Sequence, residues 1–236
     1  MRYEKIDYLK GFLVIVMILF HFNYILSNVF GIYFDISPFF LKNVQLIGGS
    51  LFIGISGFCF AISEKKHGKG IIRNYFNKIV ILAFLSLSIS LITYLSIRSQ
   101  FIVFGILHFF TLGFSLILFF RKFRYLNFII GIALIIIGNA IGSILVGSKF
   151  LFWLGFKYDG FYSADYYPVI PWFGVMIIGY SIGVFLIEKN LIDKVFSGEI
   201  KYLRIIGFLG RKSLLIYVIH APIIFLILSL FFPIRY

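Results

Sequence analysis

Long apolar runs, separated by short polar connections, dominate this chain of 236 residues. Each run holds about 20 mostly apolar residues, which is the length that an α-helix needs to cross a bilayer. Hydrophobic residues make up 61% of the chain and charged residues only 13%, whereas roughly a quarter of the residues in a soluble domain are charged. The pattern predicts an all-α, polytopic transmembrane helix bundle that forms one domain over 1–236. The seven predicted spans are 11–30, 41–63, 79–97, 101–120, 127–146, 168–187 and 213–232.

The basic residues fall unevenly on the two sides of these spans. The formal net charge is +13, and in a soluble protein such a surplus would favour nucleic-acid binding. Here 17 of the 22 Lys and Arg residues lie in alternate connections, beginning with the N-terminal one. Because cytoplasmic connections of membrane proteins are rich in Lys and Arg, we predict a cytoplasmic N-terminus and no nucleic-acid partner. The five basic residues on the other side are Lys42, Arg98, Lys149, Lys157 and Arg235.

Three histidines fall inside the predicted spans: His21 in the first, His108 in the fourth and His220 in the seventh. An ionisable group in hydrocarbon is costly and often marks a functional site, although a hydrogen-bonded interior histidine explains any single one equally well. Three of them on three helices favour a site. Neutral imidazole can act as a general base near pH 7, and three imidazoles can bind a metal. Because no span contains a carboxylate and the three depths differ, we expect no metal.

Polar and small residues recur at helical spacing inside the spans. Such faces point into a bundle rather than at lipid, and small residues let two backbones approach closely. The polar stripes are Ser86/Ser90/Thr93, Gly105/His108/Thr111/Ser115 and Ser213/Tyr217/His220, and the small-residue stripes are Ser50/Gly54/Gly57, Gly138/Gly142 and Gly179/Gly183.

The predicted outer loop 147–167 is rich in aromatic residues and holds two carboxylates, Asp159 and Asp165. An aromatic belt at the membrane surface is one interpretation. The other is a platform for a carbohydrate or lipid head group, on which the carboxylates orient a hydroxyl or a histidine. Pro168 and Pro171 predict a break or kink at the start of the sixth span.

The predicted inner side carries basic clusters around 65–78, 121–124 and 211–212, and a mixed basic and apolar stretch over 188–207 predicts an amphipathic helix there. The preference of cytoplasmic connections for positive charge explains the clusters fully. Two kinds of partner would also suit these basic clusters: anionic lipid head groups and a phosphorylated cytoplasmic cosubstrate.

Four sequence blocks follow one another along the chain: R-x4-DYLKG with FHF (2–22), FGILH (104–108), DYYPVIPWFG (165–174) and LGRKSLLIYVIHAP (209–222). Taken in this order, they resemble a known family, the catalytic domain of heparan-α-glucosaminide N-acetyltransferases, in its short prokaryotic branch. The resemblance covers essentially the whole chain and departs from the usual pattern at Lys10, where the family commonly has Arg. No histidine lies in 31–41, where the eukaryotic enzymes have their catalytic one.

This resemblance implies an integral membrane acetyltransferase in the cytoplasmic membrane of a prokaryote. Acetyl-CoA would be the cytoplasmic donor, and a cell-envelope carbohydrate or lipid at the outer face would be the acceptor, with a homodimer as a possible assembly. The first block also looks like the first helix of membrane O-acetyltransferases, in which a histidine at the matching position belongs to the active site. The predicted catalytic residues are His21, His108, Asp165 and Asp159, and the predicted donor-binding residues are Lys10, Arg211, Lys212 and His220.

Two functions of other classes compete with this one. A small proton-coupled transporter or lipid-carrier permease would use the same histidines as proton relays, but the chain has no internal repeat of the kind that transporters often carry. The third interpretation is a non-catalytic membrane protein that retains the fold of this family.

Overall fold

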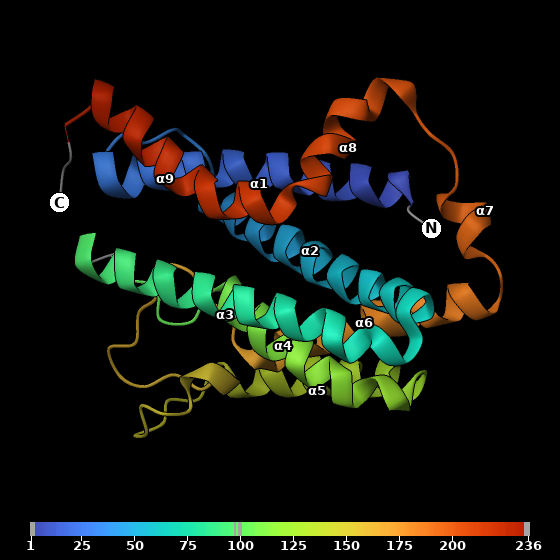
Figure 1. The fold of residues 1–236 in the computed structure, drawn as a ribbon. Helices are drawn as coiled ribbons and strands as arrows, with labels where there is room; N and C mark the ends of the chain where they lie inside the picture. Colours follow the sequence, from blue (N-terminus) through green and yellow to red (C-terminus); the bar gives the residue numbers. More distant parts are fainter. Residues whose placement is uncertain (1–2, 97, 99–100, 234–236) are drawn as a thin grey trace. The chain divides into compact units, whose positions relative to one another are not determined.

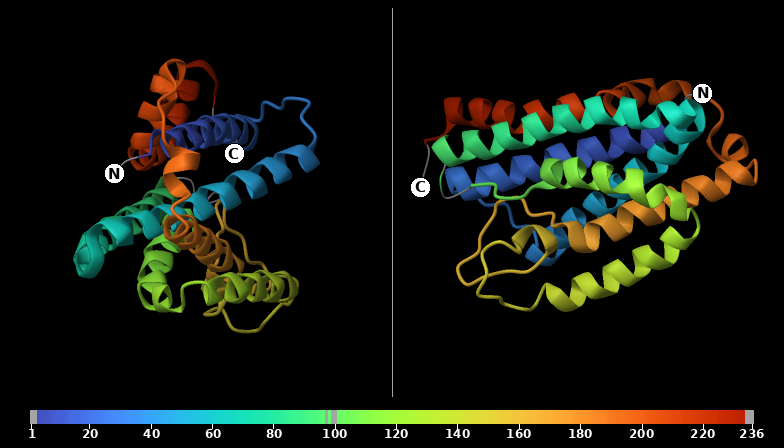
Figure 2. Two further views of the ribbon diagram at one scale, coloured as in Figure 1. Left: turned by 90° about the vertical axis from the view of Figure 1, so that its right-hand side faces the viewer. Right: turned by 60° about the horizontal axis from the view of Figure 1, so that its bottom comes forward.

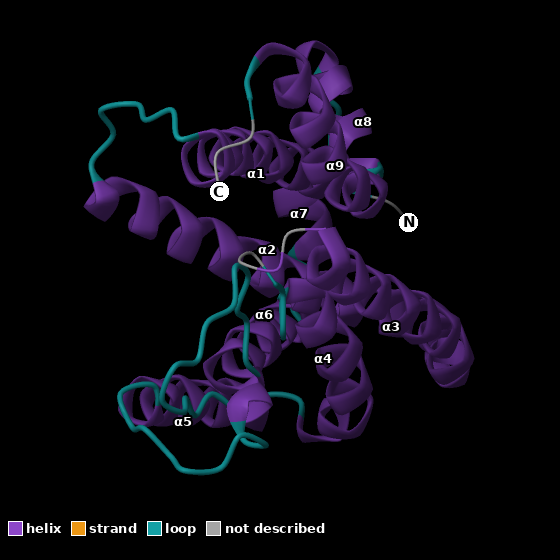
Figure 3. Ribbon diagram, turned by 90° about the vertical axis from the view of Figure 1, so that its left-hand side faces the viewer, coloured by secondary structure: helices purple, strands orange, loops and turns teal. Residues whose placement is uncertain are grey.

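The computed structural model describes residues 3–96, 98 and 101–233, and within these it holds helices and loops but no strand (Figure 3). Arg2 and Arg235, and the predicted end of the third span at residue 97, lie outside the described residues. The described helices are α1 (Glu4–Phe30), α2 (Pro38–His67), α3 (Ile71–Ser96), α4 (Ile106–Phe120), α5 (Leu126–Ile141), α6 (Val169–Glu188), α7 (Ile192–Phe196), α8 (Arg204–Arg211) and α9 (Ser213–Phe231).

The apolar helices coincide with the predicted spans. In the described part of the chain, five helical stretches are long and apolar enough to cross a membrane, and one of them, Pro38–Ser96, contains both α2 and α3. The helix α5 is apolar too but shorter than these five. The prediction of an all-α, multi-pass membrane protein is therefore confirmed.

The chain divides into two compact units, Met1–Phe52 with Asn190–Tyr236, and Ile53–Lys189. In the first unit, α1 contacts α8 near its beginning and α9 further along, and Figure 1 shows α9 in red beside α1 in blue. A buried apolar cluster joins the far ends of α1 and α9. The helix α1 ends where Gly31 adopts a left-handed conformation, with φ of 69°. The cluster consists of Leu26, Val29, Phe30, Ile224 and Leu228.

The second unit packs α6 against α5 and α4, and α3 against α4 (Figure 2). The predicted small-residue stripes lie at its closest contacts. A Cβ added at Gly179 would lie 2.0 Å from the carbonyl oxygen of Gly54, and one at Gly57 would lie 1.9 Å from that of Met176. Because hydrocarbon supplies no hydrophobic drive between helices, such close backbone packing provides much of their association.

Three predicted boundaries are wrong, each because a residue distant in sequence or a local backbone turn overrides the apolar pattern. Residues 101–105 are not helical and pair with the loop before α6, where the Tyr167 N–H donates to the Phe104 carbonyl oxygen at 3.0 Å. Residues 142–146 belong to the long loop after α5 (Figure 3). The stretch 188–207 is not one helix, because Ser197 is extended and Gly198 has φ of 95° between α7 and α8.

The predicted kink at the start of the sixth span is present. Ile170 has φ of −105° and ψ of 122°, so regular helix begins only at Pro171. A proline at the first helical position is well tolerated because its missing N–H would have no partner within the helix.

Candidate active site

Two of the intramembrane histidines lie against each other in the first unit. The rings of His21, on α1, and His220, on α9, have centroids 4.8 Å apart and meet nearly edge-on, at 77°. His220 is only 7% exposed, and His21 is half-buried. The sequence placed His220 among the donor-binding residues, whereas the structure brings it into contact with the predicted base.

Both histidines use the same ring nitrogen for a local hydrogen bond. His21 Nδ1 lies 2.9 Å from the Met17 carbonyl oxygen, and His220 Nδ1 lies 2.7 Å from that of Tyr217. A carbonyl oxygen can only accept, so Nδ1 must carry the proton in each ring, and in a neutral imidazole Nε2 then holds a free lone pair. Within the described part of the chain, buried His220 Nε2 has no hydrogen-bond partner. Each ring therefore keeps Nε2 as its basic nitrogen, and that of His220 is buried.

A glycine contact sets how α1 lies against the segment that carries His220. A Cβ added at Gly210 would lie 1.8 Å from the carbonyl oxygen of Asp7 and 2.8 Å from the backbone nitrogen of Gly11. His21 follows Gly11 by ten residues of continuous helix, about 15 Å, and His220 follows Gly210 by the same number of residues across the turn at Lys212. Because both segments leave the contact in the same direction, the two histidines arrive side by side.

The predicted donor-binding cations lie at this glycine contact rather than at the histidines. Lys10 directly precedes Gly11 on α1, and Arg211 and Lys212 directly follow Gly210. Both Arg211 and Lys212 are exposed. The first unit thus carries three cations at one end and a histidine pair about 15 Å further along the helices.

In the second unit, His108 and Asp165 are both engaged at the start of α4. The Gly105 N–H donates to His108 Nδ1 at 3.2 Å, so the proton of that ring sits on Nε2, which is 3.1 Å from Ser90 Oγ. The Ile106 N–H donates to Asp165 Oδ2 at 2.9 Å. The first N–H groups of a helix have no partner within it, so these side chains cap α4. Both ring nitrogens of His108 are used, in contrast to the histidine pair.

Replacing Asp165 should therefore affect stability more than chemistry. We expect Asp165→Ala to lower the free energy of unfolding by about 1 kcal/mol, the usual cost of losing an N-terminal cap. Asp165→Asn keeps an oxygen that accepts from the Ile106 N–H and should restore most of the loss. Thermal unfolding of the two variants in the same nanodiscs checks this, and equal losses would contradict a capping role.

The other predicted carboxylate, Asp159, is exposed in the loop after α5. Aromatic rings of this loop pack on one another, with Phe161 lying 4.8 Å from Tyr166 between ring centroids. Burial raises the pKa of the Tyr166 hydroxyl to about 12, so this group donates, here to the Phe152 carbonyl oxygen at 2.7 Å. The described residues contain no group of three or more His, Cys, Asp or Glu side chains placed to hold a metal ion.

Residues 2–222 match the family described as heparan-alpha-glucosaminide N-acetyltransferase, catalytic. The chain belongs to this family. The match includes the whole second unit, most of the first unit and all three intramembrane histidines. No curated protein and no solved structure matches the chain.

Membership of the heparan-α-glucosaminide N-acetyltransferase family confirms the resemblance that the four sequence blocks indicate. It makes this chain a member of a transmembrane acetyltransferase family, and family membership implies transferase activity. The apolar helices and the family together support a multi-pass membrane protein.

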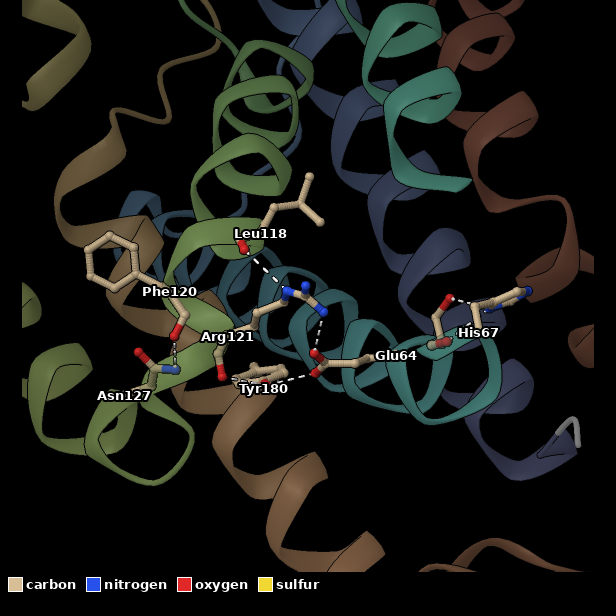
Figure 4. A network of polar contacts seen from close by, with 8 residues as sticks. Glu64, His67, Leu118, Phe120, Arg121, Asn127 and Tyr180 are labelled. Carbon is tan, nitrogen blue, oxygen red and sulfur yellow. Dashed lines mark hydrogen bonds and ion pairs between the residues drawn. The ribbon is translucent and has the colours of Figure 1, made fainter. Parts of the chain in front are cut away.

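A polar network in the second unit is not predicted from the sequence (Figure 4). Arg121 pairs with Glu64 through Nη1 and Oε1 at 2.9 Å, and the Tyr180 hydroxyl donates to Glu64 Oε2 at 2.8 Å. The residues lie on α2, after α4 and on α6, more than 50 positions apart. Only the position of Glu64, directly before a run of lysines at the end of an apolar run, could have drawn attention to it.

Proposed function

We propose that this protein transfers an acetyl group from cytoplasmic acetyl-CoA to a hydroxyl or amine of a cell-envelope carbohydrate or lipid at the outer face. The observation that carries the proposal is the His21–His220 pair, in which each Nδ1 is hydrogen-bonded to a backbone carbonyl oxygen and Nε2 is therefore the basic nitrogen of the neutral ring. Family membership supplies the reaction type. The positive charge of the alternate connections supports the orientation, with the donor on the cytoplasmic side.

In the proposed step, His21 Nε2 takes the proton of the acceptor hydroxyl or amine. The acceptor oxygen or nitrogen attacks the thioester carbonyl carbon, the carbon–sulfur bond breaks, and the thiol of CoA leaves with a proton returned by the imidazolium. The same lone pair would serve a transient acetyl-imidazole, in which His21 is the nucleophile. His220 fits as the neighbour that holds His21 in place and shares its proton.

The cations at the glycine contact suit the donor's phosphate groups. Arg211 offers a planar fork of N–H donors that can bind a phosphate through two parallel hydrogen bonds, while Lys10 and Lys212 act as point charges. These residues would hold the polar part of the donor at the cytoplasmic end of the first unit, and the histidine pair lies deeper along the same helices.

Purified protein in nanodiscs, supplied with acetyl-CoA, tests this function. We expect saturable binding with slow loss of the thioester, and a rate increase when a suitable acceptor is added. If well-folded protein binds no acetyl-CoA, the donor assignment is wrong. Proton-coupled flux in liposomes would then favour the transporter, in which the histidine pair relays protons.

A further inference from the structure

The second unit contains a cleft of about 580 Å³ that the proposed transfer reaction does not use. Its walls come from the end of α2, the turn between α4 and α5, and the last turns of α6. Three apolar side chains, the Tyr180 ring and six charged side chains line it. The lining residues that carry charge are Glu64, Lys65, Arg121, Lys122, Arg124 and Glu188.

The charges in this cleft do not balance. Four cations face two carboxylates, and each carboxylate is already engaged by a partner within the cleft: Glu64 by Arg121, and Glu188 by Arg124. Lys65 and Lys122 supply the surplus of two positive charges, and both are exposed. A phosphate monoester carries about −1.5 to −2 charges at neutral pH, so one such group would neutralise the surplus, whereas the singly charged phosphodiester of a lipid head group would neutralise half of it.

The backbone of the cleft is strained at one of its cations. Arg124 has φ of 44° and ψ of −110°, a region that favours glycine because it crowds the Cβ of any other residue. Such a conformation persists only where surrounding contacts impose it, and it concentrates at functional sites. The strain therefore singles out Arg124 as a side chain to test.

Polar contacts from neighbouring helices hold this turn in place. The Ser181 hydroxyl is 3.1 Å from the Arg124 carbonyl oxygen, and the buried Tyr180 hydroxyl is 3.0 Å from that of Arg121. The side-chain amide of Asn127, fully buried, donates to the Phe120 carbonyl oxygen at 2.8 Å (Figure 4). The guanidinium groups of the turn are therefore presented on a fixed frame.

We propose that this cleft is a phosphate-binding site, with Lys65, Lys122 and Arg124 as its ligating side chains. The preference of cytoplasmic connections for positive charge explains why basic residues occur here. That preference does not explain why the arginine is strained and held in place by two helices. It also does not explain why the carboxylates of the cleft are already paired. Arg124 has five N–H donors, so its pairing with Glu188 leaves donors for a phosphate oxygen.

The phosphate has two sources that share this chemistry, a soluble phosphorylated ligand and the head group of an anionic lipid. Inorganic pyrophosphate is the soluble probe, titrated calorimetrically into full-length protein in phosphatidylcholine nanodiscs. Phosphatidylglycerol is the lipid probe, counted by native mass spectrometry on protein released from nanodiscs that contain it. Neither measurement requires turnover, so a failure here is distinguishable from a failure of the proposed acetyl transfer.

Two cleft variants and one control make the test specific. Lys65→Gln/Lys122→Gln removes the surplus charge, and Arg124→Gly removes the guanidinium while relieving the strain. The control, Lys66→Gln/Lys69→Gln, removes the same charge from neighbouring exposed residues that do not line the cleft. We expect Arg124→Gly to weaken binding about tenfold, as the loss of one charge-assisted hydrogen bond implies, the double cleft variant to weaken it more than that, and the control to weaken it less than about twofold.

Thermal stability separates ligation from folding. Arg124→Gly should unfold at the same or a higher temperature than the wild type, while its affinity for the probe falls. Tighter binding of pyrophosphate would identify a soluble ligand, and selective retention of phosphatidylglycerol a lipid one. The proposal is overturned if neither probe binds, or if the control pair weakens binding as much as the cleft pair.

Discussion

Replacing His21 with alanine should lower the rate of acetyl-CoA turnover by about 10²- to 10⁴-fold, the usual contribution of a general base. The effect should be large because only one nitrogen of this ring can act as a base. Its Nδ1 proton is committed to the Met17 carbonyl oxygen, which leaves Nε2 as the basic atom beside His220. Thioester loss in nanodiscs, measured with saturating donor, checks the rate.

His108 provides the matched comparison, since it too is an intramembrane histidine on a polar stripe. Both of its ring nitrogens have partners in the described structure, the Gly105 N–H and Ser90 Oγ. His108→Ala should therefore lower thermal stability and leave most of the turnover of the folded fraction. A His21 variant that keeps its rate, beside a His108 variant that loses it, would reverse the assignment of the base.

The sequence predicts the depth of the histidines better than their partners. Counting 1.5 Å per residue places His21 near the middle of its span without any tertiary information. That His220 is its neighbour depends on α1 and α9 lying side by side, a contact between segments about 200 positions apart. Nothing in the position of His220 along the chain indicates which helix it meets.

Spacing alone also cannot separate an interior stripe from a helix cap. Gly105 and His108 are three residues apart, and this spacing suits both a shared helical face and a side chain that caps its own helix. The structure shows that the cap forms here, because Asp165, which follows α4 by 45 positions, accepts a hydrogen bond from the Ile106 N–H. For the same reason the fourth span begins at Ile106 and not at 101: the apolar run is continuous, but the partner that starts the helix comes from a distant loop.

Replacing Gly210 with alanine should be among the most damaging single-methyl changes in the first unit. The new Cβ would lie 1.8 Å from the carbonyl oxygen of Asp7, and backbone atoms on both sides cannot rotate away as a flexible side chain could. Overpacking of this kind typically costs 1–3 kcal/mol and occasionally more, and we expect about 3 kcal/mol here. A large fall in unfolding temperature, or loss of folded protein from nanodiscs, checks the prediction.

Gly48 on α2 is the matched control, because an added Cβ there would meet nothing within 4 Å. Gly48→Ala should be neutral, or stabilising by up to about 1 kcal/mol, since alanine favours a helix more than glycine does. The Gly210 contact also fixes where α9 leaves α1, so a folded Gly210→Ala variant should lose turnover through displacement of His220 from His21. An unchanged unfolding temperature together with full turnover would mean that the glycine contact does not position the histidine pair.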